Sequence, residues 1–269
     1  MPLVFVHRPP VPLEVEKLRL ILSTYQDGTG MLQDKKNKGR TLPGWRDFER
    51  AVALAFGGIA PENKAVFDVL LSGPERPGVT YGLSCKMRGE LDRLDRDGRV
   101  TIELSNSAKK FWAHLKTKKI DGTNYKKRPR RVGVALVELV EGWHQAASIK
   151  QGGNVDLASS SYLALSWNKK GWYQLHWFAL KLPDPHLLKW YYPTEGHLSG
   201  DDNSGTIFEW YGESGGQLKY YPLADTALWA SDRFRLEPLP ASLEHGILAK
   251  VAVYFPDLWA LACKTSSTL

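Results

Sequence analysis

Cysteine is scarce in this sequence, which has only Cys85 and Cys263 among its 269 residues. Two isolated cysteines supply neither a zinc-ligand spacing nor a disulfide framework, and they fit a reducing cytosol. No apolar run reaches the roughly 20 residues that span a bilayer, and the first residues lack the basic-then-apolar order of a secretion signal. These absences predict a cytoplasmic protein that has no membrane partner.

The sequence also lacks the short motifs of several enzyme classes. It contains no Walker motif, no G-x-G-x-x-G and no zincin signature, which gives no support to an NTPase, a dehydrogenase or a zincin. Residues 212–216 do match G-x-S-x-G, a pattern that resembles the nucleophile segment of trypsin-like proteases. A serine hydrolase also needs His and Asp partners, and the seven histidines are scattered. A glycine-rich hairpin turn is the favoured interpretation.

Positive charge is abundant. The net charge is +7 and the pI about 9.2, which favours a polyanionic partner, although a basic protein without such a partner is the plain alternative. The length suits one large domain or two small ones, and 43% hydrophobic residues suffice for a sizeable core. Composition shifts near residues 151–154. We therefore expect a catalytic core with an N-terminal arm over residues 1–150 and a β-rich, Trp-rich region over residues 151–269 that serves DNA recognition or oligomerisation.

Hydrophobic patterning predicts an α/β fold, with a mixed central sheet flanked by helices. Helices are expected over residues 13–25, 43–58, 105–115, 131–145 and 246–261. Strands are expected over residues 66–71, 81–87, 99–104, 162–167, 172–182, 206–211 and 217–221. Residues 1–12 are predicted to be an extended arm, and residues 26–40 a mobile loop.

One acid and one lysine stand out inside apolar strand segments. Alternation along residues 81–87 places Ser84 and Lys86 on one face of the strand and Cys85 on the other. A lysine on a buried strand is costly unless an anion lies beside it. The preceding segment, residues 66–71, is apolar except for Asp68, and a turn-rich link joins the two segments. We predict that Asp68 and Lys86 lie close together on adjacent strands.

This pair suits metal-assisted hydrolysis but lacks a second carboxylate. A carboxylate binds Mg²⁺, which lowers the pKa of a bound water, and an ammonium steadies the developing charge. Ser84 stands where the second acid is expected. Glu103 is one candidate replacement, because an antiparallel pairing of residues 99–104 with residues 83–87 sets it opposite Ser84 in one register. Glu49 is the other, on a predicted helix surface, where it equally suits a solvated residue that pairs with Arg46 or Arg50.

This order of residues resembles the PD-(D/E)xK nuclease core over residues 43–115. The Ser-Cys-Lys form is similar to type II restriction endonucleases that cut CCGG-containing sites, in which Ser replaces the first acid and a later Glu supplies the carboxylate. The resemblance implies Mg²⁺-dependent, site-specific cleavage of double-stranded DNA by a homodimer or homotetramer, with a cognate DNA methyltransferase in the same system. It departs at Phe67, where the family has Pro. The catalytic residues that the resemblance implies are Asp68, Lys86, Glu103, Ser84 and Glu49. The metal ligands that it implies are Asp68, Glu103 and the backbone carbonyl of Cys85.

A basic block follows the candidate site. Residues 109–131 contain ten Lys or Arg and one acid, Asp121, with aromatic residues between them. Such a block suits contact with nucleic-acid phosphates, and a solvated helix face is the alternative. The competing function is a non-catalytic nucleic-acid-binding protein in which Asp68 and Lys86 form a structural ion pair. The predicted DNA-contacting residues are Lys109, Lys110, Lys126, Lys127, Arg128, Arg130 and Arg131.

Overall fold

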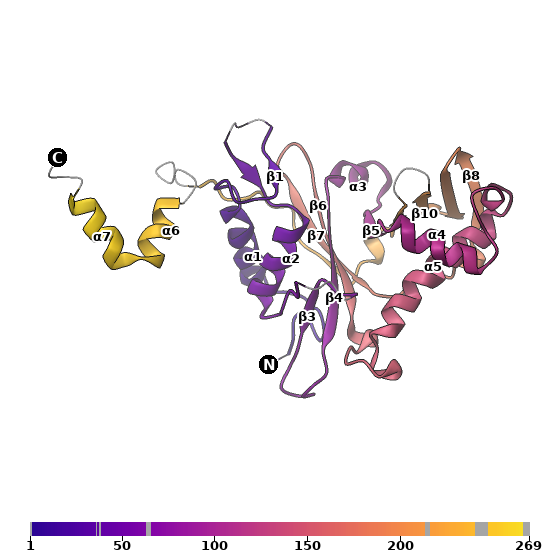
Figure 1. The fold of residues 1–269 in the computed structure, drawn as a ribbon, viewed down its shortest axis with the longest axis horizontal. Coiled ribbons are helices and arrows are strands. Elements are labelled where there is room, and N and C mark those ends of the chain that lie inside the picture. Colours follow the sequence, from indigo (N-terminus) through magenta and orange to yellow (C-terminus); the bar gives the residue numbers. More distant parts are fainter. Residues whose placement is uncertain are drawn as a thin grey trace.

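The computed structural model describes residues 2–35, 37, 39–62, 66–212, 216–239 and 247–265, with the backbone alone for residues 247–249 and 261–265. Within these ranges the strands form two five-stranded sheets and one short hairpin. The overall class is mixed α/β, as the sequence predicts, with sheets flanked by helices (Figure 1).

The first sheet carries the predicted Asp68–Lys86 strands. Its order is β12-β7-β6-β4-β3. Strands β3 and β4 are antiparallel, β4 and β6 parallel, and β6 and β7 antiparallel. The chain therefore crosses over between β4 and β6, as parallel neighbours require. The bounds are β3 Val69–Leu71, β4 Tyr81–Arg88, β6 Ser161–Trp167, β7 Tyr173–Ala179 and β12 Trp229–Ala230.

The second sheet has the order β5-β11-β10-β9-β8, and its neighbouring strands are antiparallel. Each sheet combines strands from both sides of residue 150, so the expected boundary there does not separate the sheets. The second sheet also overturns one prediction, because β5 joins it instead of pairing with β4. The bounds are β5 Ile102–Ser105, β8 Lys189–Thr194, β9 His197–Asp202, β10 Gly205–Tyr211 and β11 Gln217–Tyr220.

Helices α1 (Pro12–Thr24) and α2 (Trp45–Phe56) cover one face of the first sheet. Phe48 and Val52 of α2 share a buried cluster with Leu83 and Cys85 of β4. Helix α2 ends at Gly57, whose φ of 73° is the left-handed conformation that glycine adopts without strain. The helices predicted over residues 13–25 and 43–58 are thus confirmed.

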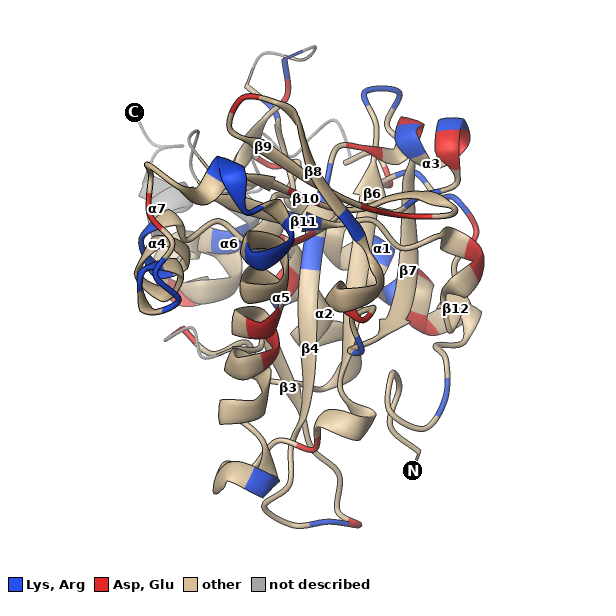
Figure 2. Ribbon diagram, turned by 90° about the vertical axis from the view of Figure 1, so that its right-hand side faces the viewer, with Lys and Arg blue, Asp and Glu red and all other residues tan. Residues whose placement is uncertain are grey.

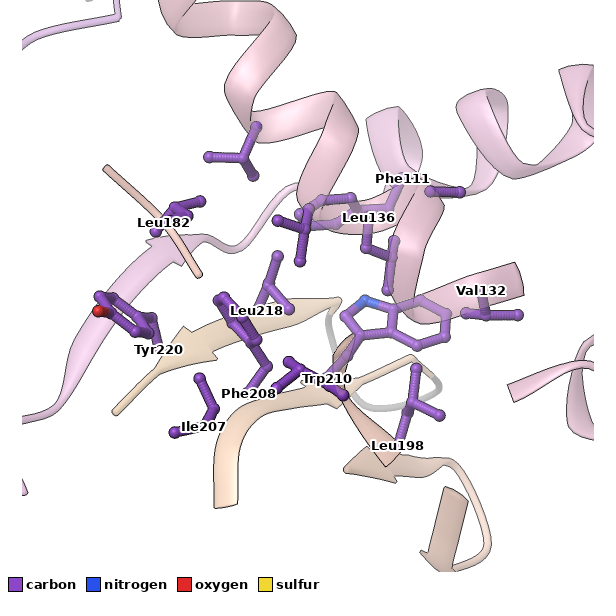
Figure 3. Close-up of a cluster of buried hydrophobic side chains, with 14 of the residues drawn as sticks. Phe111, Val132, Leu136, Leu182, Leu198, Ile207, Phe208, Trp210, Leu218 and Tyr220 are labelled. Carbon is purple, nitrogen blue, oxygen red and sulfur yellow. The ribbon is translucent and has the colours of Figure 1, made fainter. Parts of the chain in front are cut away.

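Helix α5 (Pro129–Ala146) packs between the two sheets, beside α4 (Ala108–Thr117). Figure 3 shows the buried cluster on the second sheet, in which Trp210 and Phe208 lie near Leu136 and Val132 of α5. The other face of the first sheet contributes residues such as Tyr162 to the same cluster. Burial of the apolar side chains in this shared cluster favours the packing of both sheets against α5.

Several local predictions need correction. Residues 1–12 are not an extended arm: a turn bridges Val4 to Arg8 and buries Phe5 completely. Residues 26–40 are not simply a loop, because β1 (Leu32–Gln33) pairs with β2 (Thr41–Leu42). A helix that the sequence did not predict, α3 (Leu91–Asp97), precedes β5 and ends at Gly98. The tail forms two helices, α6 (Ile247–Tyr254) and α7 (Pro256–Thr265), because Pro256 interrupts the run.

Candidate active site

Asp68 and Lys86 meet, as the sequence predicts. The backbone N–H of Asp68 donates to the Leu83 carbonyl over 3.0 Å, which places the acid at the start of β3 beside β4. The Lys86 Nζ then lies 2.7 Å from Asp68 Oδ2, and the Ser84 hydroxyl donates to the same oxygen over 3.5 Å. The side chains of Lys86 and Asp68 are 18% and 11% exposed. A carboxylate, a hydroxyl and an ammonium are therefore gathered at a largely buried position.

Gly82 and the end of α5 shape this position. A Cβ at Gly82 would collide with the Phe67 ring, so only glycine lets that ring lie over β4. Phe67, which stands where the resembling family has Pro, stacks on His144 of α5 with ring centroids 5.6 Å apart. Burial, and then the nearby Lys86 charge, lowers the pKa of His144 to about 4. His144 is therefore a neutral imidazole against the acid-bearing turn at neutral pH.

Glu103 is not opposite Ser84, which corrects the predicted register. Strand β5 pairs with β11, where Glu103 faces Lys219. The physical reason is that Ile102 of β5 is completely buried against α4, α5 and the second sheet, and β6 occupies the edge of β4. Glu103 instead reaches β4 through Arg88, whose Nη1 donates to Glu103 Oε2 over 2.7 Å. Strand alternation puts Arg88 on the same face as Lys86.

The prediction that Glu49 lies on a helix surface is wrong. Glu49 is only 4% exposed, and Arg46 Nη1 lies 3.5 Å from Glu49 Oε2. Helix α2 covers the Cys85 face of β4, which is opposite to the face of Lys86. The Cys85 side chain is likewise buried under α2, so only its backbone remains as the predicted metal ligand. Glu49 thus belongs to the helix behind the sheet.

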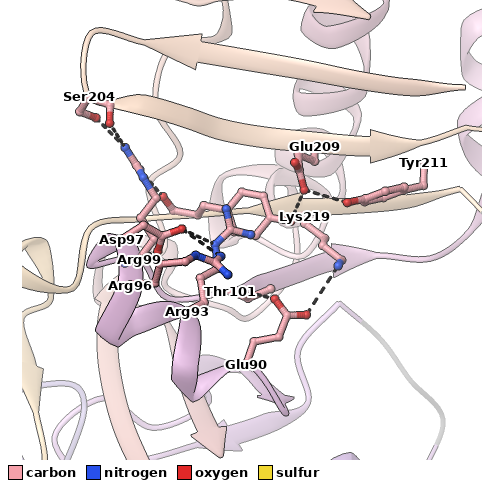
Figure 4. A network of polar contacts seen from close by, with 11 residues as sticks. Glu90, Arg93, Arg96, Asp97, Arg99, Thr101, Ser204, Glu209, Tyr211 and Lys219 are labelled. Carbon is pink, nitrogen blue, oxygen red and sulfur yellow. Dashed lines mark hydrogen bonds and ion pairs between the residues drawn. The ribbon is translucent and has the colours of Figure 1, made fainter. Parts of the chain in front are cut away.

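Glu90 joins Glu103 near Arg88. The Thr101 hydroxyl donates to Glu90 Oε2 over 2.7 Å, and Lys219 Nζ lies 3.6 Å from Glu90 Oε1, as Figure 4 shows. Arg88 Nη2 lies 3.4 Å from the same Oε1. Burial opposes ionisation of Glu90, but the Thr101 hydrogen bond and the Lys219 and Arg88 charges outweigh it and lower its pKa. Glu90 is therefore a carboxylate that a hydrogen bond from Thr101 and the charges of Lys219 and Arg88 fix in the same cluster.

The donor chemistry suits Mg²⁺, but the ligands are not assembled. Oxygen donors are what Mg²⁺ requires, and Asp68, Glu103 and the Cys85 carbonyl would supply them. Among the described residues, however, no three His, Cys, Asp or Glu side chains gather as a metal-binding group. Asp68 instead pairs with Lys86, and Glu103 with Arg88, so each of these carboxylates is engaged by a cation of the protein. A metal held by Asp68, Glu103 and the Cys85 carbonyl remains a prediction.

Arg88, Glu90 and His144 were not predicted as residues of this site. The alternation that joins Ser84 to Lys86 also extends to Arg88, so this residue was accessible to sequence reasoning. Glu90 lies just after β4 and is fixed from Thr101 and Lys219, which come from other parts of the chain. His144 lies on α5, and no sequence signal places that helix end against Phe67.

Basic residues gather around α4 and the start of α5, where Figure 2 shows blue segments. Beside them lies a groove with a volume of about 400 Å³, an apolar floor that includes Ile120 and Val134, and a basic rim. Of the seven predicted DNA contacts, Arg130 and Arg131 line this groove and the other five do not. Those five are exposed on neighbouring surfaces, except that Arg128 is half-buried. The charged and polar rim residues of the groove are Lys118, Arg130, Arg131, Glu138 and His186.

Comparison with protein-family models, with curated proteins and with solved structures found no match for this chain. None of the helices in the described ranges combines the length and apolar character needed to cross a bilayer.

Proposed function

We propose that the chain is a Mg²⁺-dependent endonuclease that hydrolyses phosphodiester bonds of double-stranded DNA, in the manner of type II restriction enzymes. The observation that carries this proposal is the contact of Asp68 with Lys86, 2.7 Å apart on neighbouring antiparallel strands, with Ser84 beside them. The acid, serine and lysine of the resembling motif are thereby brought into one cluster. The parallel crossover from β4 through α5 to β6 is compatible with a restriction-endonuclease-like core, which we include in the proposal.

The proposed roles follow from the chemistry of each group. Asp68 holds the metal, which when bound would lower the pKa of a water and polarise a phosphoryl oxygen. Lys86 orients the water and stabilises charge at the attacked phosphorus. Ser84 contributes a hydrogen bond, since a hydroxyl cannot supply the charge of a second acid. Glu103 supplies that charge, with Glu49 as the less favoured candidate because it lies on the helix behind the sheet.

The basic groove supports a nucleic-acid substrate. Fourteen residues of α5 separate Arg130 from His144, which at 1.5 Å per residue is about 21 Å. That length corresponds to roughly six nucleotides along one strand of B-DNA. A duplex whose backbone contacts Arg130 and Arg131 therefore has to extend by roughly six nucleotides to reach the Asp68–Lys86 pair. A homodimer or homotetramer, and a cognate methyltransferase that protects host DNA, belong to this proposal.

A divalent-metal-dependent plasmid nicking assay tests the proposal. The wild-type chain is expected to cut with Mg²⁺ and to stop in a chelator, whereas Asp68→Ala and Lys86→Ala lose cleavage and keep DNA binding. Glu103→Ala compared with Glu49→Ala identifies the second carboxylate: we expect the first to be nearly inactive. Asp95→Ala, on the exposed side of α3, is the control and should cut normally. A wild-type rate in Asp68→Ala would contradict the assignment.

The second candidate is a non-catalytic DNA- or RNA-binding protein. It is favoured by the ion pairing itself, because Lys86 already satisfies Asp68 and Arg88 already satisfies Glu103. Under this alternative the wild-type chain binds nucleic acid with a strong salt dependence and never nicks it, whatever divalent metal is added.

A further inference from the structure

Arg88 holds a carboxylate on the face of β4 that also carries Lys86. Its Nη1 donates to Glu103 Oε2 over 2.7 Å. The Arg88 side chain is 29% exposed and Glu103 is 17% exposed. The Arg88 side chain is therefore more exposed than the Lys86 side chain, at 18%, while the Glu103 side chain is mostly covered.

Glu90 and Glu103 depend on Arg88 to different degrees. Glu90 is also held by the Thr101 hydroxyl and by Lys219 (Figure 4). In the described part of the chain, the side-chain hydrogen bond and the ion pair of Glu103 come from Arg88 alone. If Arg88 leaves, Glu90 keeps its partners, whereas Glu103 loses its hydrogen bond and its ion pair, and the nearby Lys219, opposite it on β11, is already paired with Glu90. A largely covered carboxylate that has lost its ion pair is unfavourable until another cation approaches.

Ion pairs engage the carboxylates of this cluster. Among the described side chains, Asp68 pairs with Lys86, Glu103 with Arg88, and Glu90 with Arg88 and Lys219, so three carboxylates lie beside three cationic side chains. A divalent ion that binds Glu103 therefore competes with Arg88, to which this carboxylate is already paired. A guanidinium pairs with phosphate as well as with carboxylate, often through two parallel hydrogen bonds. A phosphate group is therefore a competing partner for Arg88.

We propose that Arg88 is a latch: it occupies Glu103 in the free protein, and a DNA phosphate draws it away, which opens Glu103 to a divalent metal. This rests on the proposed function, since it concerns the same site. Arg88 is a positioning residue that acts through Glu103. By linkage, DNA and metal then strengthen each other's binding by the same factor. The free protein is expected to bind metal weakly, because Arg88 occupies Glu103.

The test measures Mn²⁺ binding to the full chain by titration calorimetry, without DNA. Arg88→Met is expected to bind Mn²⁺ about tenfold more tightly than wild type, because a competing cation is removed. Lys219→Met is the matched control: it removes a cation that forms its ion pair with Glu90, and it should change the affinity less than about twofold. The double variant Arg88→Met with Glu103→Gln should lose the gain, and Arg88→Lys should behave like wild type.

Equal tightening in Arg88→Met and Lys219→Met would mean that only net charge matters and would overturn the latch. An Arg88→Met affinity no higher than wild type would also overturn it. Thermal unfolding of each variant identifies any loss of fold. Arg88→Lys then supplies the comparison within a folded protein, in which retained wild-type affinity supports the latch and marked tightening opposes it. Adding a duplex of roughly 20 base pairs, long enough to span the groove and the site, should tighten Mn²⁺ binding in wild type and hardly in Arg88→Met.

Failure of the latch is distinguishable from failure of the proposed function. If wild type nicks plasmid DNA with Mg²⁺ and Arg88→Met shows no tighter Mn²⁺ binding, the nuclease proposal is supported and the latch proposal is contradicted. If wild type never nicks DNA, the nuclease proposal is contradicted, and the calorimetric comparison still decides whether Arg88 excludes a cation from Glu103.

Discussion

Lys86 Nζ lies 2.7 Å from Asp68 Oδ2 across the pairing of β3 with β4, at a position that is largely shielded from solvent. Both partners come from apolar strand segments, so each would be a costly buried charge without the other. The same contact fits two interpretations, a nuclease centre and a structural ion pair, and these differ in what happens to cleavage when one partner is removed.

A double-mutant cycle measures how far the two side chains depend on each other. Asp68→Asn and Lys86→Met each remove this ion pair and should lower the free energy of unfolding by about 1–3 kcal/mol. The double variant should cost clearly less than the sum, with a coupling of about 1–2 kcal/mol in urea unfolding. Arg96 and Asp97 form the control pair, because Arg96 is 72% exposed and its coupling should be near zero. A coupling equal to that of the control would show that the contact adds no stability.

The basic groove should control the salt dependence of DNA binding. Replacing Lys118, Arg130 and Arg131 with Ala should weaken binding to all sequences and flatten the log–log salt slope by up to about 0.9 per lost phosphate contact. The block variant Lys126→Ala, Lys127→Ala and Arg128→Ala should act similarly. Lys17→Ala, on α1 behind the first sheet, is the control with an unchanged slope. Unchanged slopes in both triple variants would leave only the solvated-face interpretation.

His144 should make stability depend on pH. Burial lowers its folded pKa to about 4, below the unfolded value of about 6.5. Because the unfolded chain binds the proton more readily, the contribution of this group is fully present above pH ~6.5 and is lost as the pH falls from there toward 4. Between pH 7 and pH 5 the loss is about 2 kcal/mol for this group.

Replacing His144 with Phe keeps an aromatic ring against Phe67 and removes the titration. Urea unfolding of His144→Phe should therefore show a pH dependence about 2 kcal/mol smaller between pH 7 and pH 5. His176, whose pKa burial and then Arg233 also lower to about 4, should give a similar result as His176→Phe. His186→Phe, at an exposed position, is the control. An unaltered pH dependence in His144→Phe would show that this histidine does not stay neutral in the folded state.

Two glycines should respond to alanine with opposite signs. In Gly82→Ala the new Cβ collides with the Phe67 ring, so we expect a loss of about 1–3 kcal/mol in the free energy of unfolding and a displaced Asp68. Gly142 lies in α5, and nothing is within 4 Å of the place where an alanine methyl would lie, so Gly142→Ala should stabilise the helix by up to about 1 kcal/mol. Thermal or urea unfolding of both variants checks this. A neutral Gly82→Ala would mean that the ring can move freely.

The Asp68–Lys86 neighbourhood was predictable from the sequence because its causes are local. Strand alternation fixed which side chains share a face with Lys86, and the short turn-rich link between two apolar runs made them antiparallel neighbours. Helices α2 and α5 and strands β6 and β7 followed in the same way from apolar periodicity and turn residues. The resemblance to a nuclease core rests on these same local features, and the proposed activity awaits the nicking assay.

The partner of Glu103 was decided by the tertiary structure. Polar and apolar residues alternate along residues 99–104, which predicts a strand. This alternation does not say which sheet the strand joins, because the strand pairs wherever its apolar face can be buried. Ile102 is buried against α4, α5 and the second sheet, while β6 takes the free edge of β4 through the crossover. Glu103 therefore faces Lys219 and meets Arg88, and Glu49 is covered behind the sheet. Sequence determined which groups the first sheet carries on each face; long-range packing determined which carboxylates come near them.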